Sequence, residues 1–152
     1  EIANILDKDE AACRQLFSRA KRHLVDNRPR YQADEQQHDA LLESFLAACQ
    51  SGNINELESV LASEVVITVD GGGEVTAATR PIYGRSRVSQ FLHGIFAHGL
   101  NQVPFETILV NNQLGLVAYY ESKPIILLMI ENDHNSIQRI WAIRNPKKLA
   151  TI

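Results

Sequence analysis

Val65-Val66-Ile67-Thr68-Val69-Asp70-Gly71-Gly72-Gly73 is the stretch of this 152-residue chain around which its fold is predicted. Its first five residues are all β-branched, and side chains with such stiff rotamers favour a packed β-strand. Asp70 follows directly, and the three glycines after it allow backbone conformations that other residues rarely adopt. A carboxylate at the mouth of a glycine turn indicates either a functional site or a hinge.

Three helices are predicted around this strand. Apolar residues recur at helical spacing over residues 41–49, and Gly52 ends that run. Asn53 and Glu56 have the spacing of a capping box and open a second, short helix. Residues 88–96, beyond the strand, repeat the helical spacing. We therefore expect the strand to pack against helices.

Four more segments of strand length follow, and short polar turns separate them. They are Phe105–Val110, Leu114–Tyr120, Ile125–Ile130 and Ile137–Ile143. Consecutive strands with such short links pair antiparallel. Helices followed by a meander predict an α+β fold, in which a curved antiparallel sheet wraps three helices and leaves a cone that can hold a small ligand.

The composition indicates an ordinary globular protein. With 45% apolar and 22% charged residues, the chain can bury one core and a small extra module. No apolar run approaches the ~20 residues that cross a bilayer, and no signal-peptide pattern is present. We expect a soluble, cytoplasmic protein. Cys13 and Cys49 have no metal-ligand spacing, so we expect no disulfide framework.

Charge is distributed unevenly along the chain. Residues 1–31 carry seven Lys and Arg against five Asp and Glu, whereas residues 32–152 carry eight against thirteen. A basic arm on an acidic body suggests two functions joined in one chain. The chain begins at Glu1 with a helical pattern already under way, so we expect it to be part of a longer protein.

The basic arm has the pattern of a helix-turn-helix. Residues 2–6 predict a first helix, and Asp7-Lys8-Asp9 predicts the turn. The second helix has an inner stripe of Cys13, Leu16, Phe17, Ala20 and Leu24. On its other face the candidate DNA-binding residues are Arg14, Gln15, Ser18, Arg19, Lys21 and Arg22. An amphipathic helix with a solvated basic face remains the alternative.

A domain boundary is predicted where the helical pattern breaks. Pro29 ends a helix at or before Arg28, and polar residues dominate residues 32–38. We therefore expect a helix-turn-helix end over residues 1–28, a linker over 29–36 and a separate domain over 37–152. A continuous helical hairpin across the boundary is the alternative.

Residues 1–24 resemble the end of the −35-binding domain of extracytoplasmic-function RNA polymerase sigma factors. The resemblance implies that Arg14, Gln15, Ser18 and Arg19 face promoter DNA, with Lys21 and Arg22 near its backbone. It also implies RNA polymerase core and promoter DNA as partners of the full-length protein. This sequence contains neither the first helices of that domain nor the domain that melts the −10 element, so we expect weak promoter binding by this chain alone.

The order of elements after the linker resembles the SnoaL-like superfamily, the cystatin-like α+β cone that ketosteroid isomerases share. The nearest resemblance is to sigma factors of the same class with a C-terminal SnoaL-like domain. Asp70-Gly71-Gly72-Gly73 and Asn145-Pro146-Lys147-Lys148-Leu149 are the motifs that carry it. It implies that both motifs contact the sigma domains, so the predicted regulatory interface is Asp70, Gly71, Gly72, Gly73, Asn145, Pro146, Lys147 and Leu149. A frayed tail with ordinary lysines is the alternative for the second motif.

The residues argue against catalysis. In the isomerases an aspartate near Asp70 acts as a base with a tyrosine and a protonated acid as partners. Phe45 and residues 126–129 occupy those positions here, and neither donates to an oxyanion. We therefore expect Asp70 to cap its turn or meet a basic partner. His93 and His98 are five residues apart on the predicted third helix, so their side chains point in different directions and do not form a metal-binding pair. We expect no metal and no cofactor.

Four aromatic residues are candidates to line the cone: Phe45, Tyr119, Tyr120 and Trp141. Aromatic side chains on a curved sheet also serve as plain core, so both interpretations stay open. The most favoured function is a built-in regulator of a sigma factor. The alternatives are a small-molecule sensor, an isomerase-like enzyme that uses Asp70, and a dimerisation module that makes the chain a homodimer.

Overall fold

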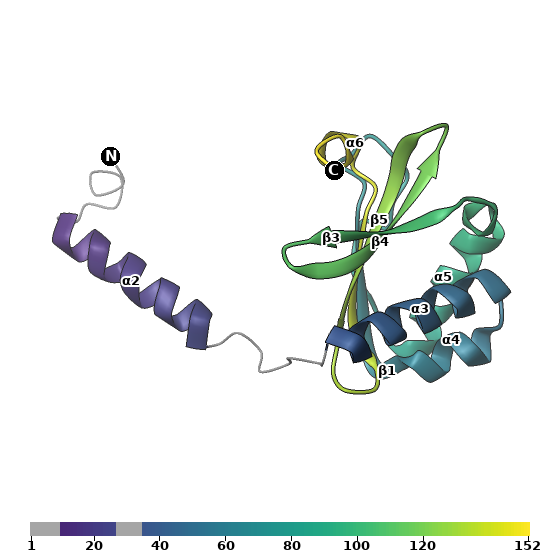
Figure 1. Ribbon diagram of the computed structural model, residues 1–152, viewed down its shortest axis with the longest axis horizontal. Coiled ribbons are helices and arrows are strands. Elements are labelled where there is room, and N and C mark those ends of the chain that lie inside the picture. The colour runs from purple at the N-terminus through teal and green to yellow at the C-terminus, as the bar shows by residue number, and fades with distance from the viewer. Residues whose placement is uncertain (1–9, 27–34) are drawn as a thin grey trace. The chain divides into compact units, whose positions relative to one another are not determined.

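The computed structural model describes residues 10–26 and 35–152. The chain divides into two compact units, residues 1–32 and residues 33–152, which we call the N-terminal unit and the cone unit. Helix α2 (Glu10–Asp26) is the described element of the N-terminal unit (Figure 1). It corresponds to the second helix of the predicted helix-turn-helix. The predicted first helix and turn lie outside the described residues.

The three helices predicted for the cone unit are α3 (Glu35–Ser51), α4 (Ile54–Val60) and α5 (Arg85–Ala97). Because α3 begins at Glu35, residues 35 and 36 are helical, although the linker was expected to reach residue 36. Asn53 caps α4 as predicted: its side-chain oxygen accepts from the Asn55 and Glu56 backbone amides at 3.1 and 3.4 Å. Its side-chain nitrogen also donates to the Glu56 carboxylate at 2.9 Å.

The cone unit has one six-stranded sheet in the order β2-β1-β6-β5-β4-β3. Its strands are β1 (Leu61–Asp70), β2 (Ile82–Tyr83), β3 (Phe105–Val110), β4 (Gln113–Tyr120), β5 (Lys123–Asn132) and β6 (Ile137–Ile143). The expectation of a fully antiparallel sheet is wrong at one pair, since β1 and β6 run parallel. Strands β3 to β6 form the meander, and its last strand, β6, lies beside β1 and runs in the same direction.

The sheet curves around the helices. Register shifts between Ala118 and Tyr119 and between Glu131 and Asn132 mark irregularities that bend its long strands. Helices α3, α4 and α5 lie together against one face (Figure 1). Their apolar side chains form the core with that face of the sheet, and its largest fully buried residues include Phe45, Phe96, Leu92, Ile67, Leu128 and Ile140.

The opposite face of the sheet carries a second, smaller apolar cluster. Leu149, in the short helix α6 (Pro146–Leu149), packs there with Val117 and Leu127. The second motif is therefore an ordered helix, not a frayed tail. Helix α6, strand β2 and the 3-10 helix η1 (Leu100–Gln102) are short elements that sequence periodicity did not predict.

A buried polar network fixes the start of α3 to the sheet. His38 is 6% exposed, and its Nδ1 lies 2.7 Å from Asn132 Oδ1. Its Nε2 lies 3.1 Å from the carbonyl oxygen of Leu114. One imidazole therefore ties α3 to both β4 and β5.

None of the helices in residues 10–26 and 35–152 is long and apolar enough to cross a membrane.

Candidate regulatory site

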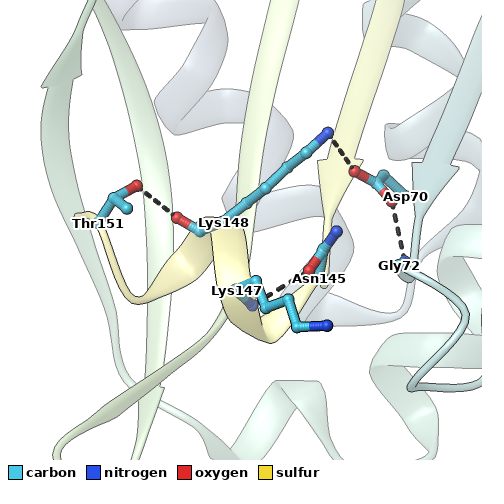
Figure 2. Close-up of polar contacts among 6 residues, drawn as sticks. All are labelled: Asp70, Gly72, Asn145, Lys147, Lys148 and Thr151. Atoms are coloured by element: carbon cyan, nitrogen blue, oxygen red, sulfur yellow. Dashed lines mark hydrogen bonds and ion pairs between the residues drawn. The ribbon is translucent and has the colours of Figure 1, made fainter.

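The two motifs, far apart in the sequence, meet at one end of the sheet. Because β1 and β6 run parallel, Asp70 is paired with Ile143 at the ends of the two strands. The glycine turn and helix α6 therefore leave the sheet side by side (Figure 2). We call residues 70–74 together with residues 145–149 the loop–tail cluster.

The Asp70 carboxylate has two partners in this cluster (Figure 2). Its Oδ2 lies 2.7 Å from Nζ of Lys148, and its Oδ1 accepts from the Gly72 amide at 2.9 Å. The hydrogen bond with Lys148, followed by that with the Gly72 amide, lowers the pKa of Asp70. Asp70 thus both caps its turn and meets a basic partner, as predicted.

Two of the glycines are required by close packing. A Cβ on Gly71 would lie 2.6 Å from the Val75 carbonyl oxygen, and one on Gly72 would lie 2.5 Å from Asn145 Cγ. Gly72 also has a φ of +64°, which favours glycine. Gly73 is exposed beside them. The turn therefore follows one path, with its backbone against the Asn145 side chain.

The second motif builds its own capped helix. The Asn145 side-chain oxygen accepts from the Lys147 amide at 3.1 Å, and Pro146 occupies the first turn, where no amide donor is needed. Leu149 is buried in the small apolar cluster on the sheet. Leu149 and Gly71 therefore hold the cluster in place from inside, while Pro146 and Lys147 are exposed.

The charged residues of the cluster form two ion pairs near the surface. Besides the pair of Lys148 with Asp70, Lys147 Nζ lies 2.7 Å from Glu74 Oε1. Lys148 and Glu74 were not among the predicted interface residues. The signal that could have found them is opposite charge, since acids lie in and beside the first motif and lysines in the second. Exposed pairs of this kind contribute little to stability because water screens them, so they can exchange partners.

A cavity of about 1150 Å³ opens in the cone unit. Tyr119 and Tyr120 line it, as predicted. The prediction for Phe45 is wrong because its ring is fully buried in the core. The prediction for Trp141 is also wrong because its register places the ring on the other face of the sheet, 37% exposed. Asp70 is not among the described residues that line the cavity.

The predicted DNA-binding residues lie on α2. Arg14, Gln15, Ser18 and Arg19 have exposed side chains. Lys21 and Arg22 belong to the same helix, but their side chains lie outside the described part. Leu16 and Phe17, expected on an inner stripe, are 45% and 71% exposed. The predicted first helix, residues 2–6, lies outside the described residues.

The chain is similar to sigma factors over almost its whole length. It is 28% identical to the ECF RNA polymerase sigma factor SigJ of Mycobacterium tuberculosis, over 97% of this chain and 51% of SigJ. The crystal structure of SigJ matches 99% of this chain with a TM-score of 0.69 and covers 54% of the SigJ chain. SigI of the same organism, described as a probable ECF RNA polymerase sigma factor, is 30% identical over 98% of this chain and 49% of SigI.

The fold is shared more widely. An NTF2-like protein of Burkholderia xenovorans matches 76% of this chain and 95% of its own, with a TM-score of 0.51 and 14% identity, which shows the fold alone. No family model matches the chain. The chain spans about half the length of the curated relatives it matches. Over both units, the chain is therefore similar to extracytoplasmic-function RNA polymerase sigma factors.

Proposed function

We propose that this chain is part of an alternative sigma factor that acts in transcription initiation, and that the cone unit regulates it through contacts with the sigma domains. Helix α2 contacts promoter DNA in this proposal, and RNA polymerase core is the second partner. One observation carries the regulatory part: the two motifs meet in one cluster that presents charged side chains near the surface.

The energetics of the cluster suit a regulatory contact. Leu149 and the packed glycines fix its backbone, while Lys147 and Lys148 hold their acids only through exposed ion pairs. Exposed pairs contribute little to stability, so a second surface of suitable charge can replace them at small cost. The excess of acidic residues over residues 32–152 favours contact of the cone unit with a positively charged surface of the sigma domains.

The same geometry supports a regulator over an enzyme. The Asp70 carboxylate is occupied by Lys148 and the Gly72 amide. A general base must reach the proton that it abstracts, and Asp70 is outside the described lining of the cavity. We infer that the cone unit regulates without catalysis. A cytoplasmic location follows from this role, and self-association of the chain is a prediction that light scattering tests.

The test uses the full-length sigma factor with RNA polymerase core and a target promoter. Asp70→Lys and Lys148→Asp each place like charges together, and we expect each to change promoter-directed transcription several-fold. Lys123→Glu is the matched control, because Lys123 is exposed at the β4–β5 turn, outside the cluster. We expect it to leave transcription unchanged.

Two further variants decide how the cluster acts. The double variant Asp70→Lys/Lys148→Asp restores the ion pair. Recovery of transcription supports a cluster that acts by keeping its own shape, and persistent change supports direct contact between these side chains and another surface. Deletion of residues 34–152 tests the proposal as a whole. Unchanged transcription and promoter choice after this deletion would contradict it.

A further inference from the structure

The cavity of the cone unit has the size and lining of a ligand site. Its volume of about 1150 Å³ is large enough for one drug-sized molecule, since such sites measure about 300–1,000 Å³. Much of its wall is apolar, with Val69 from β1, Phe91 and Ile95 from α5, and Ile125 from β5. An apolar body therefore gains free energy by leaving water for this cavity.

Arg144 supplies a cationic group in the same wall. It follows β6, is half-buried, and donates from one terminal nitrogen to the Thr76 carbonyl oxygen at 2.7 Å. Among the described residues, no ion pair joins it to a carboxylate. A guanidinium carries five N–H donors, so donors remain for a carboxylate or sulfonate, which it binds with two parallel hydrogen bonds.

Two acids, Glu106 and Glu121, also line the cavity. Both have exposed side chains, so their carboxylates can turn towards water at little cost. Arg144 is instead held in the wall by Thr76. Arg144 is therefore the charged group of the lining that is held in place, and it can pair with the anionic group of a ligand.

The cavity and the loop–tail cluster share one piece of backbone. Gly72 packs against Asn145, whereas Thr76, Ala77 and Ala78 of the same loop line the cavity. The Arg144 amide also donates to the Asp70 carbonyl oxygen at 2.7 Å. A molecule that contacts Arg144 or Thr76 therefore contacts a residue that lies one or two positions along the chain from the cluster.

We propose that the cavity binds an amphipathic small molecule, with its apolar body in the cone and an anionic group on Arg144, and that binding stabilises the loop–tail cluster. The proposal of binding is independent of any role in transcription. Only the interpretation of ligand binding as a regulatory signal rests on the proposed function. By linkage, a ligand that binds better to the ordered loop shifts the cluster towards its ordered state.

The first experiment uses the 152-residue chain and the dye 8-anilinonaphthalene-1-sulfonate, which has an apolar body and one anionic group. We expect saturable binding with one dye per chain. Ala78→Trp fills the cavity and should weaken binding by about tenfold or more. Thr79→Trp is the matched control, since Thr79 is the next residue but is exposed and outside the described lining, and binding should stay unchanged. Equal binding by both variants would overturn the proposed site.

The second experiment tests the anionic group. Arg144→Met should weaken binding of the sulfonate dye by about tenfold. It should leave binding of the neutral analogue N-phenyl-1-naphthylamine unchanged. Equal losses for the two dyes would overturn the assignment of an anion to Arg144.

The third experiment tests coupling to the cluster. Trypsin cleaves after Lys148, within α6, and mass spectrometry follows the release of the residues beyond it. We expect the sulfonate dye to slow this cleavage at least about twofold, because opening of the cluster becomes rarer. The dye should have no effect on the Ala78→Trp variant. An unchanged rate in the parent chain would overturn the coupling. None of these measurements uses polymerase or promoter, so their failure is distinct from failure of the proposed function.

Discussion

The backbone of Gly72 lies against the side chain of Asn145 so closely that a Cβ on Gly72 would be 2.5 Å from Asn145 Cγ. The contact joins the turn after β1 to the residue that caps α6. It places two motifs from distant parts of the sequence in one structure. The geometry of either motif therefore depends on the other.

Gly72→Ala should disturb this contact. Alanine at a φ of +64° is strained and its methyl displaces Asn145, so we expect the free energy of unfolding to fall by about 1–3 kcal/mol. Gly94→Ala is the control, because a Cβ on Gly94 in α5 meets open space. It should be neutral or stabilising by about 0.4–1 kcal/mol. Urea unfolding measures both, and equal effects would contradict the interpretation.

The contribution of Asp70 should depend on pH. Since Lys148 and the Gly72 amide lower its pKa in the folded chain, its stabilising effect exists above the unfolded pKa of about 3.9. The effect is lost as the pH falls through the folded pKa. We expect the stability difference between the parent chain and Asp70→Asn to be constant from about pH 7 to 5 and to shrink below about pH 4.

Asp133 also has a lowered pKa, because the Asn135 and Ser136 amides bond its carboxylate. The stabilising effect of Asp133 is lost at acid pH in both the parent chain and Asp70→Asn. It therefore cancels in the stability difference between the two. A difference that stays the same down to about pH 2 would contradict the assigned role of Asp70.

Leu149 should anchor α6 to the sheet. Leu149→Ala removes its packing against Val117 and Leu127, and we expect a loss of about 2–5 kcal/mol in the free energy of unfolding. Ile152→Ala lies in the same segment, but Ile152 is exposed, so we expect a change within about 0.5 kcal/mol. Similar small effects from both would show that α6 is not held by Leu149.

His38 should be important for the position of α3. His38→Ala leaves the half-buried Leu114 carbonyl and the buried Asn132 side chain without this partner, and loss of a buried partner costs about 1–3 kcal/mol. His134→Ala is the control, since His134 is exposed and its removal should cost less than about 0.5 kcal/mol. Thermal unfolding by circular dichroism compares the two.

The DNA-binding assignment is tested in the full-length protein. If Arg14 and Arg19 read bases, Arg14→Ala and Arg19→Ala should each weaken promoter binding by about 1–3 kcal/mol and relax sequence preference. Arg87→Ala, on the exposed surface of α5, should leave binding unchanged. Unchanged binding by both α2 variants would remove the assignment.

Local patterns predicted most of the fold. The bounds of β3 and β6 match Phe105–Val110 and Ile137–Ile143, because polar turns bracket apolar strands there. The parallel pairing of β1 with β6 was not predicted, since no local pattern records which distant strands become neighbours. For the same reason, the sequence indicated both motifs but not the contact of Lys148 with Asp70.

Side-chain placement was harder to predict than strands. Trp141 lies beside Thr68 and Met129, and a shift of one residue in that register would have turned it to the other face. His38 lies in a polar stretch of the sequence, and its burial depends on Asn132 and Leu114, which are distant in sequence. Burial of a single polar residue is thus decided by tertiary contacts.

The position of β6 has a consequence for synthesis on the ribosome. Strand β6 joins β1 and β2 to the other three strands, so the sheet stays in two parts until residues 137–143 have been translated. Translation proceeds from the N-terminus at about 5–20 residues per second, and α2 leaves the ribosome well before that strand. Each nascent chain therefore passes through a period in which its basic helix is already made and the domain proposed to restrain it is still incomplete.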